Sequence, residues 1–303
     1  MSSSSPLGRS RPQACALVLA VVTAVLLAGC AVSGTPRREA MKDPIRCSAS
    51  ECPELPVFSS KRLAESGVTA ANASTTVPAY LTAVLDDLES VWQEWFAELN
   101  IENAAAGRVL ITPGTSYRSE CLKDTELRSG IPSDYPNAFY CLLDSEPDGG
   151  GTARKGSVIL PVTTFAEMWD GKLMGSSGIL LGDFTAATII AHEYGHNVMY
   201  RLLEAYSMDK REGPTGDAPE LLADCFAGNW AATVFGRKDL SFKEMAQAAM
   251  LIISIGDPAP GQGHGTSLAR AKALWKGFSD NLKRQGTPGD CLQAYWPAVL
   301  RSA

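Results

Sequence analysis

Residues 189–198 read IIAHEYGHNV, and this stretch decides what kind of domain the chain builds. The four-residue spacing of His192 and His196 predicts a helix with both imidazoles on one face, because four residues make about one helical turn. Two imidazoles one turn apart can bind a single cation. Glu193 projects beside them, where its carboxylate can reach a water on the metal rather than the metal itself. The stretch therefore predicts two metal ligands and a base.

A third ligand must come from elsewhere in the chain, since a catalytic zinc site usually has three protein ligands and leaves the fourth position to water. The chain has three histidines, so the third ligand is either His264 or a carboxylate. Residues 219–225 read PELLADC and offer Glu220, with Asp224 one helical turn further on. If Glu220 binds the metal, Asp224 can accept the ring N–H of a metal-bound histidine and fix its tautomer. The alternative is that Glu220 only opens its helix, a position that the helix dipole favours.

Apolar residues recur at helical spacing along much of the chain. We expect helices over residues 78–102, 183–204, 218–236, 242–255 and 266–284. Two stretches, residues 108–112 and 157–163, are typical of strands. The expected fold is one α+β domain with a helical majority and a small β-sheet.

The first thirty residues predict export from the cytosol. Arg9 and Arg11 precede an apolar run over residues 14–27, which is the pattern of a secretion signal. Residues 27–30 read LAGC and resemble a bacterial lipobox, in which the signal is cut before the cysteine and the sulfur takes a fatty acyl chain such as palmitate. The alternative is an uncleaved membrane anchor, although the run is shorter than the ~20 residues that span a bilayer. Either way we expect the folded part outside the cytosol, lipid-anchored through Cys30 to the outer face of the bacterial cell membrane.

Composition divides the chain into three parts. Residues 1–29 are the expected lipoprotein signal peptide, residues 30–76 a lipid-anchored flexible tether, and residues 77–303 the folded domain. The tether is rich in Ser, Thr, Pro and Ala and has no sustained apolar period.

Six cysteines follow Cys30, and an extracytoplasmic location makes them candidates for disulfide bonds. Sequence alone does not choose among the possible connectivities. Because each pair is isolated from the others along the chain, we expect the pairs Cys47–Cys52, Cys121–Cys141 and Cys225–Cys291. The alternative for Cys225 is a small buried thiol without a partner.

The overall charge argues against nucleic acid as a partner. The chain is 45% hydrophobic and 20% charged, with a formal net charge of -6. Its length is sufficient to bury a substantial core. Binding a phosphate backbone normally needs a basic face, so we expect no nucleic-acid partner.

Motifs spread over residues 105–295 together resemble the bacterial neutral zinc metallopeptidases, relatives of the wider gluzincin-like group. In the family's order they are FYC at 139–141, HEYGH at 192–196, ELLADCFAG at 220–228, and HGTS at 264–267 followed by Arg270. The resemblance implies a helix-rich zincin-like metallopeptidase domain. It also implies Zn²⁺ as the cofactor, Glu220 as the third ligand and peptides or proteins as substrates.

The implied reaction uses Glu193 as the general base, which takes a proton from a zinc-activated water and delivers it to the leaving amine. The tetrahedral oxyanion needs a second donor besides zinc. His264 is the candidate donor, and Tyr194 or Tyr200 could serve instead. The strand at residues 157–163 could pair with an extended substrate from an edge of the sheet, since the proline within it donates no hydrogen bond.

Two other functions stay open. One is a catalytically silent zinc-binding envelope lipoprotein, acting as a scaffold or recognition module. Glu193 argues against it, because structural zinc sites tend to use four protein ligands and need no base. The other is a zinc amidase acting on cell-wall peptides rather than proteins.

Overall fold

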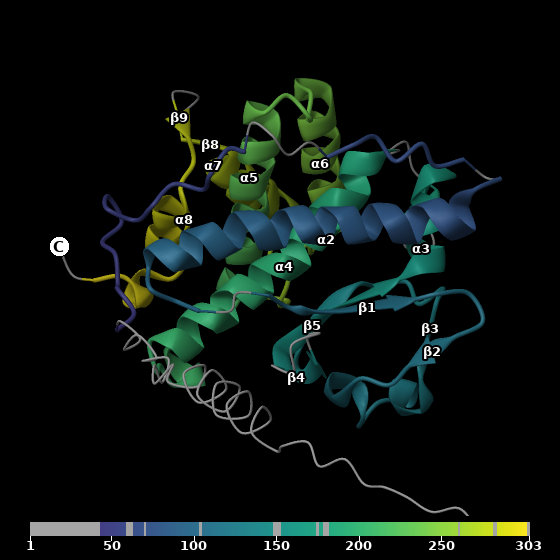
Figure 1. Cartoon of the computed structure of the whole chain (residues 1–303), viewed down its shortest axis with the longest axis horizontal. Coiled ribbons are helices and arrows are strands. Elements are labelled where there is room, and N and C mark those ends of the chain that lie inside the picture. Colours follow the sequence, from purple (N-terminus) through teal and green to yellow (C-terminus); the bar gives the residue numbers. More distant parts are fainter. Residues whose placement is uncertain are drawn as a thin grey trace, which may run out of the picture. The chain divides into compact units, whose positions relative to one another are not determined.

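A small β-sheet lies against a layer of packed helices in the computed structural model of the protein (Figure 1). The structure describes residues 43–58, 63–69, 71–102, 105–147, 153–173, 176–177, 182–259, 261–280 and 284–301. The chain from Asp43 onward forms one compact unit. The expected signal peptide and Cys30 lie outside the described residues. None of the helices within the described ranges is long and apolar enough to cross a bilayer.

The main elements confirm the expected α+β class with a helical majority. The helices are α2 (Ala73–Glu98), α3 (Val162–Trp169), α4 (Asp183–Ala205), α5 (Ala218–Gly236), α6 (Phe242–Ser254), α7 (Ser267–Phe278) and α8 (Pro288–Tyr295). The longer strands are β1 (Gly107–Ile111), β4 (Phe139–Pro147) and β5 (Ala153–Pro161). Two-residue strands are β2 (Ser116–Tyr117), β3 (Ile131–Pro132), β6 (Lys172–Leu173), β7 (Ser176–Ser177), β8 (Ser279–Asp280) and β9 (Arg284–Gln285).

All of the helices expected from periodicity are present, and α3 and α8 are additions. Residues 162 and 163, the end of the expected strand over residues 157–163, belong to α3, because β5 ends at Pro161. The expected helix over residues 266–284 ends at Phe278, and β8 follows it. Periodicity does not predict α8, although its first residues carry a cap. The Asp290 N–H donates to the Thr287 hydroxyl, and the Thr287 N–H donates to the Asp290 carboxylate. The capping residues Thr287 and Asp290 therefore indicate where α8 begins, whereas apolar spacing does not.

The main sheet has the strand order β1-β5-β4. Because β5 pairs with β1 in parallel and with β4 in antiparallel, it is the central strand, and the expected edge position of residues 157–163 is wrong. Pro161 is the last residue of β5 and the cap of α3, so its missing N–H lies at the end of the ladder. β4 is an edge strand. Its sequence, FYCLLDSEP, has no clean alternation, and its register shifts between Cys141 and Ser145.

The three expected disulfides are present, as Cys47–Cys52, Cys121–Cys141 and Cys225–Cys291. The second ties β4 to the loop that follows β2, and the third ties α5 to α8. Cys225 is therefore a disulfide partner and not a free buried thiol.

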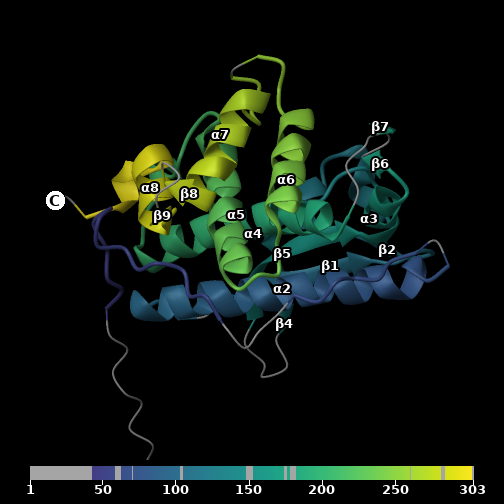
Figure 2. The same cartoon turned by 90° about the horizontal axis from the view of Figure 1, so that it is seen from above.

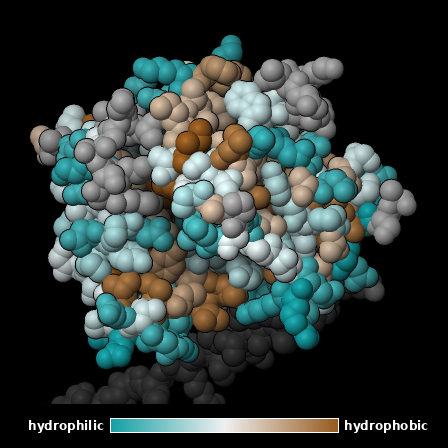
Figure 3. Space-filling model, turned by 180° about the vertical axis from the view of Figure 1, so that it is seen from behind, coloured by the Kyte–Doolittle hydropathy of each residue, from teal (hydrophilic) through white to brown (hydrophobic). Residues whose placement is uncertain are grey.

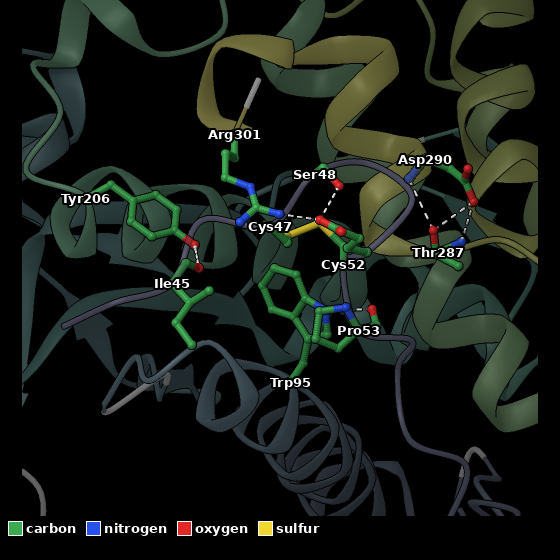
Figure 4. The surroundings of a disulfide bond; sticks show 11 residues. Ile45, Cys47, Ser48, Cys52, Pro53, Trp95, Tyr206, Thr287, Asp290 and Arg301 are labelled. Carbon is green, nitrogen blue, oxygen red and sulfur yellow. Dashed lines mark hydrogen bonds and ion pairs between the residues drawn. A yellow bond between two sulfur atoms is a disulfide. The ribbon is translucent and has the colours of Figure 1, made fainter. Parts of the chain in front are cut away.

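Residues 43–58 pack on the domain, which corrects the expectation of a flexible tether up to residue 76 (Figure 4). The indole N–H of Trp95, on α2, donates to the Pro53 carbonyl at 3.0 Å. The Arg301 N–H, near the C-terminus, donates to the Cys47 carbonyl at 2.9 Å. The composition of this segment is that of a loop, but partners far away in sequence hold it in place. We call it the N-terminal clasp.

Candidate metal centre

His192 and His196 lie on one face of α4, as their spacing predicts. Their ring centroids are 4.9 Å apart, and the ring planes are 86° to one another. Most residues of α4 are buried, so neighbouring elements surround this helix. That burial restricts the directions in which the two imidazoles can point.

A glycine lets α5 approach the two histidines. A Cβ atom on Gly195 would lie 2.9 Å from both the Cα and the carbonyl oxygen of Ala223, closer than real Cβ atoms come. Glycine in a helix costs stability relative to alanine, and here the close contact between α4 and α5 requires it. This contact brings the first turn of α5, with Glu220, beside the metal face of α4.

The Glu220 carboxylate lies against both imidazoles. Its Oε2 is 3.2 Å from Nε2 of His192, and its Oε1 is 3.4 Å from Nε2 of His196. One ligand atom from each of the three residues lies within 4.8 Å of the others. Two imidazole nitrogens and a carboxylate oxygen form a donor set that suits zinc, so these residues fit a single metal ion.

The electrostatics of the three residues favour a charged carboxylate. Burial alone would raise the pKa of Glu220, but hydrogen bonds and charges from His192 and His196 hold it far below its ordinary value. Burial alone would lower the pKa of His192, but the charge and hydrogen bond of Asp224 raise it to about 10. The site therefore attracts positive charge, which is what a cation ligand set requires.

Asp224 supports the His192 ring from the side away from Glu220. Its Oδ1 is 2.8 Å from Nδ1 of His192, and the residue is fully buried. Arg270 holds the same carboxylate with two hydrogen bonds, from Nε to Oδ2 at 2.7 Å and from Nη2 to Oδ1 at 2.9 Å. The bidentate pair orients Asp224, and Asp224 in turn leaves Nε2 of His192 directed at Glu220.

Glu193 is buried next to the two histidines. Burial raises the pKa of its carboxyl, and the charges of His192 and His196 oppose that rise without cancelling it. The backbone N–H of Tyr140, on β4, donates to the Glu193 carboxylate. A carboxylate with a raised pKa can accept a proton and return it near neutral pH. Sequence reasoning missed the contribution of Tyr140, because β4 itself was not predicted.

A cavity of about 530 Å³ opens over this centre. The candidate metal-site residues line it, as do residues 137–140, just before and at the start of β4. The lining also includes Lys210 and a set of apolar side chains from α4, from the C-terminal end of α6 and the residue after it, and from the loop before α5: Ile189, Met199, Leu203, Pro214, Ile252 and Ile255.

The candidate oxyanion donors lie in different places. His264 lines the cavity, its side chain is 66% exposed, and its Nδ1 is 3.4 Å from Oδ1 of Asp257. Tyr200 also lines the cavity and stacks on Tyr140 with ring centroids 5.7 Å apart. Tyr194 is buried and is not among the cavity residues, so of the two tyrosines Tyr200 is the one at the cavity.

The fold and the site define a class of protein: a helix-rich α+β domain with a His-His-Glu centre that could hold a metal ion. The sequence pattern of one known family matches residues 55–285. The chain belongs to this family, which is described as "Putative neutral zinc metallopeptidase". The matched region begins inside the N-terminal clasp and includes every residue of the metal centre.

Curated relatives carry no assigned activity. The chain is 27% identical over 232 residues to "Uncharacterized protein YpfJ" of Escherichia coli strain K12, an alignment that covers 70% of this chain and 69% of that protein. The YpfJ protein of Escherichia coli O6:H1 matches with the same identity and coverage. No solved structure matches the chain.

Proposed function

We propose that this protein is a zinc-dependent peptidase in which His192, His196 and Glu220 bind the metal and Glu193 is the general base. The observation that carries the proposal is the Glu220 carboxylate, 3.2 and 3.4 Å from the two Nε2 atoms, with the Glu193 carboxylate buried beside them. Zinc bound to these residues would acidify a water molecule and polarise the peptide carbonyl.

The residues of the chain then move the protons. Glu193 accepts a proton from the attacking water and passes it to the leaving amine. The Tyr140 N–H holds the Glu193 carboxylate in place during both transfers. Asp224 and Arg270 keep the His192 ring in one tautomer and orientation.

His264 is proposed as the donor to the tetrahedral oxyanion, with Tyr200 as the alternative. Both side chains line the cavity. His264→Ala and Tyr200→Phe should be compared for turnover and for zinc content. The donor is the residue whose loss lowers turnover while zinc content is unchanged, and unchanged turnover in a variant removes that residue from the role.

The substrate is proposed to be an extended peptide lying beside β4. Residues 137–140 line the cavity, and β4 is an edge strand of the main sheet, with β5 as its partner among the described strands. An edge strand can pair with a peptide backbone regardless of its side chains. The apolar side chains of Ile189, Met199 and Leu203 in the cavity lining favour peptides with apolar side chains next to the cleaved bond.

The decisive experiment measures metal content and peptide hydrolysis for the wild type and for Glu193→Gln. Retained zinc with lost cleavage supports the peptidase proposal, whereas equal cleavage by both proteins contradicts it. A random peptide library and purified wall fragments, each with and without chelator, then separate a peptidase from a wall amidase. A silent binding lipoprotein would cleave neither.

We further propose that a lipid on Cys30 anchors the protein to the outer face of the cell membrane. The support is the LAGC sequence at residues 27–30 after a basic and apolar leader. Metabolic labelling with a palmitate analogue tests this, because a Cys30→Ala variant should lose the label.

A further inference from the structure

Helices α6 and α7 form a helical hairpin and stand side by side in Figure 2. The two helices are antiparallel. The ring of Phe242, at the start of α6, lies 6.2 Å from that of Trp275, near the end of α7. Asp257, just after α6, bridges to Thr266, just before α7. The inner face of the hairpin is buried against the domain, and its outer face is exposed in the part of the chain that the structure describes.

The outer face of this hairpin is unusually apolar. Of the large hydrophobic side chains that are exposed in the described part of the chain, half belong to these two helices. They are Phe242 at 62%, Met250 at 54%, Ile253 at 46% and Leu268 at 63% exposure. Figure 3 shows that apolar and hydrophilic side chains are interspersed on one face of the molecule. Exposed apolar groups concentrated on one element mark an interaction surface.

Three lysines stand on the two helices that carry these apolar side chains. Lys243 and Lys272 are exposed, and Lys276 is half-buried, on the same two helices. The acidic residue of α6 is Glu244, whose carboxylate accepts hydrogen bonds from Ser241, and α7 has no acidic residue. This basic character is local, because the whole chain has a formal net charge of -6.

We propose that the outer face of the α6–α7 hairpin binds an anionic lipid surface. Exposed apolar side chains on a helix can enter the boundary between headgroups and acyl chains, while lysines contact the acidic headgroups. A second copy of the chain fits less well, because a two-fold interface would bring the lysines of both copies together. The matching of apolar and basic groups therefore favours a membrane.

This inference does not depend on the proposed peptidase activity. The inner-face residues Ile252 and Ile255 line the cavity, whereas Phe242, Met250 and Leu268 do not. Lipid binding can therefore be lost without touching the metal ligands. A positive result would also place the cavity close to the lipid surface, since both faces belong to one hairpin.

The test uses the chain from residue 43 onward, which forms a compact unit and carries no lipid of its own. Sedimentation with vesicles of phosphatidylglycerol should bring down the protein, and vesicles of phosphatidylcholine should bind it about tenfold more weakly. Binding to the anionic vesicles should weaken in about 0.5 M NaCl, because salt screens the lysines.

Two variants locate the binding to the hairpin. Met250→Ser with Leu268→Ser should reduce binding to anionic vesicles by about tenfold or more, because both side chains lose their apolar contact with lipid. Leu143→Ser is the matched control, since Leu143 is 53% exposed but lies on β4. It should bind as the wild type does.

Charge reversal provides a second variant that does not depend on apolar substitution. Lys243→Glu with Lys272→Glu changes only exposed side chains and should also weaken binding to anionic vesicles. Three outcomes would overturn the proposal: no binding to anionic vesicles, equal binding to neutral vesicles, or variants that bind like the wild type. Self-association in solution that the serine variant abolishes would assign the face to a second copy instead.

Discussion

Asp224 Oδ1 lies 2.8 Å from Nδ1 of His192, on the opposite side of the ring from the nitrogen that faces Glu220. Helix α5 therefore contacts His192 on α4 through two side chains. One is the proposed ligand Glu220, and the other is Asp224, one helical turn later. Since Asp224 is fully buried and paired with Arg270, it has no freedom to serve another partner. The contact with Asp224 therefore fixes the His192 ring in the orientation in which Nε2 faces Glu220.

Asp224→Asn should weaken zinc binding by about 10-fold to 100-fold, because a neutral amide supports the histidine ring less well than a carboxylate. Competition with a chromogenic chelator measures the affinity. Asp257→Asn is the matched control, since Asp257 pairs with the exposed His264 rather than with a proposed ligand. Equal zinc affinity in all three proteins would remove Asp224 from its supporting role.

Glu193→Gln should keep the metal and lose about 10²-fold to 10⁴-fold in peptide hydrolysis, the usual contribution of a general base. Metal analysis and a fluorogenic peptide assay on the same preparation give both values. Glu204→Gln provides the comparison, because Glu204 is on the same helix but its side chain is 45% exposed and pairs with Arg201. A Glu193→Gln protein as active as Glu204→Gln would contradict the mechanism.

The arrangement of the residues in the candidate metal centre was predictable in part, because some of its signals are local. One helical turn separates His192 from His196, and another separates Glu220 from Asp224, so helix geometry alone places each pair on one face. The convergence of the two pairs is a tertiary contact, and the family resemblance, rather than periodicity, implied it. Arg270 follows the HGTS motif at residues 264–267, but the sequence did not predict that it supports Asp224.

The parts of the fold that periodicity did not predict depend on non-local partners. β5 is the central strand because β1 and β4 pair with its two sides. The sequence of residues 157–163 does not indicate either pairing. The N-terminal clasp is similar. Its composition is that of a linker, and contacts with Trp95 and Arg301 fix it on the domain. Pairing order and docking are set by long-range contacts, which short sequence windows do not contain.

Gly195→Ala should separate α4 from α5 and weaken both stability and zinc affinity. The new methyl group would lie 2.9 Å from the carbonyl oxygen of Ala223, and overpacking of this kind costs about 1–3 kcal/mol of unfolding free energy. Gly236→Ala is the control, because its methyl group would meet only the side chain of Val57, at 3.3 Å. Denaturant unfolding and chelator competition measure the two effects, and a Gly195→Ala protein with wild-type values for both would show that the contact can relax.

Removal of the metal should lower the thermal stability of the domain. Zinc held by side chains from α4 and α5 would bind the folded chain and not the unfolded one, and this would contribute about 4 kcal/mol when free zinc exceeds the dissociation constant 1,000-fold. The unfolding temperature should therefore fall when chelator is added to the wild type. His196→Ala should unfold at a temperature that chelator no longer changes, whereas His264→Ala should still respond. A His264→Ala protein that does not respond would make His264 a ligand.

The disulfides should differ in their contribution to stability. Cys225 and Cys291 are 66 residues apart in sequence, and Cys47 and Cys52 are 5 apart. A longer closed loop restricts the unfolded chain more, so paired serine substitutions should cost about 4 kcal/mol for the first bond and about 2 kcal/mol for the second. Denaturant unfolding of the two double variants measures this order. Hydrolysis by the folded Cys47→Ser, Cys52→Ser protein should stay at the wild-type rate, because neither Cys47 nor Cys52 is among the residues that line the metal cavity. Lost hydrolysis with an intact fold would instead connect the clasp to the metal cavity. If the Cys47–Cys52 bond contributes more to the free energy of unfolding than the Cys225–Cys291 bond, docking of the clasp, rather than loop closure, dominates its stabilising effect.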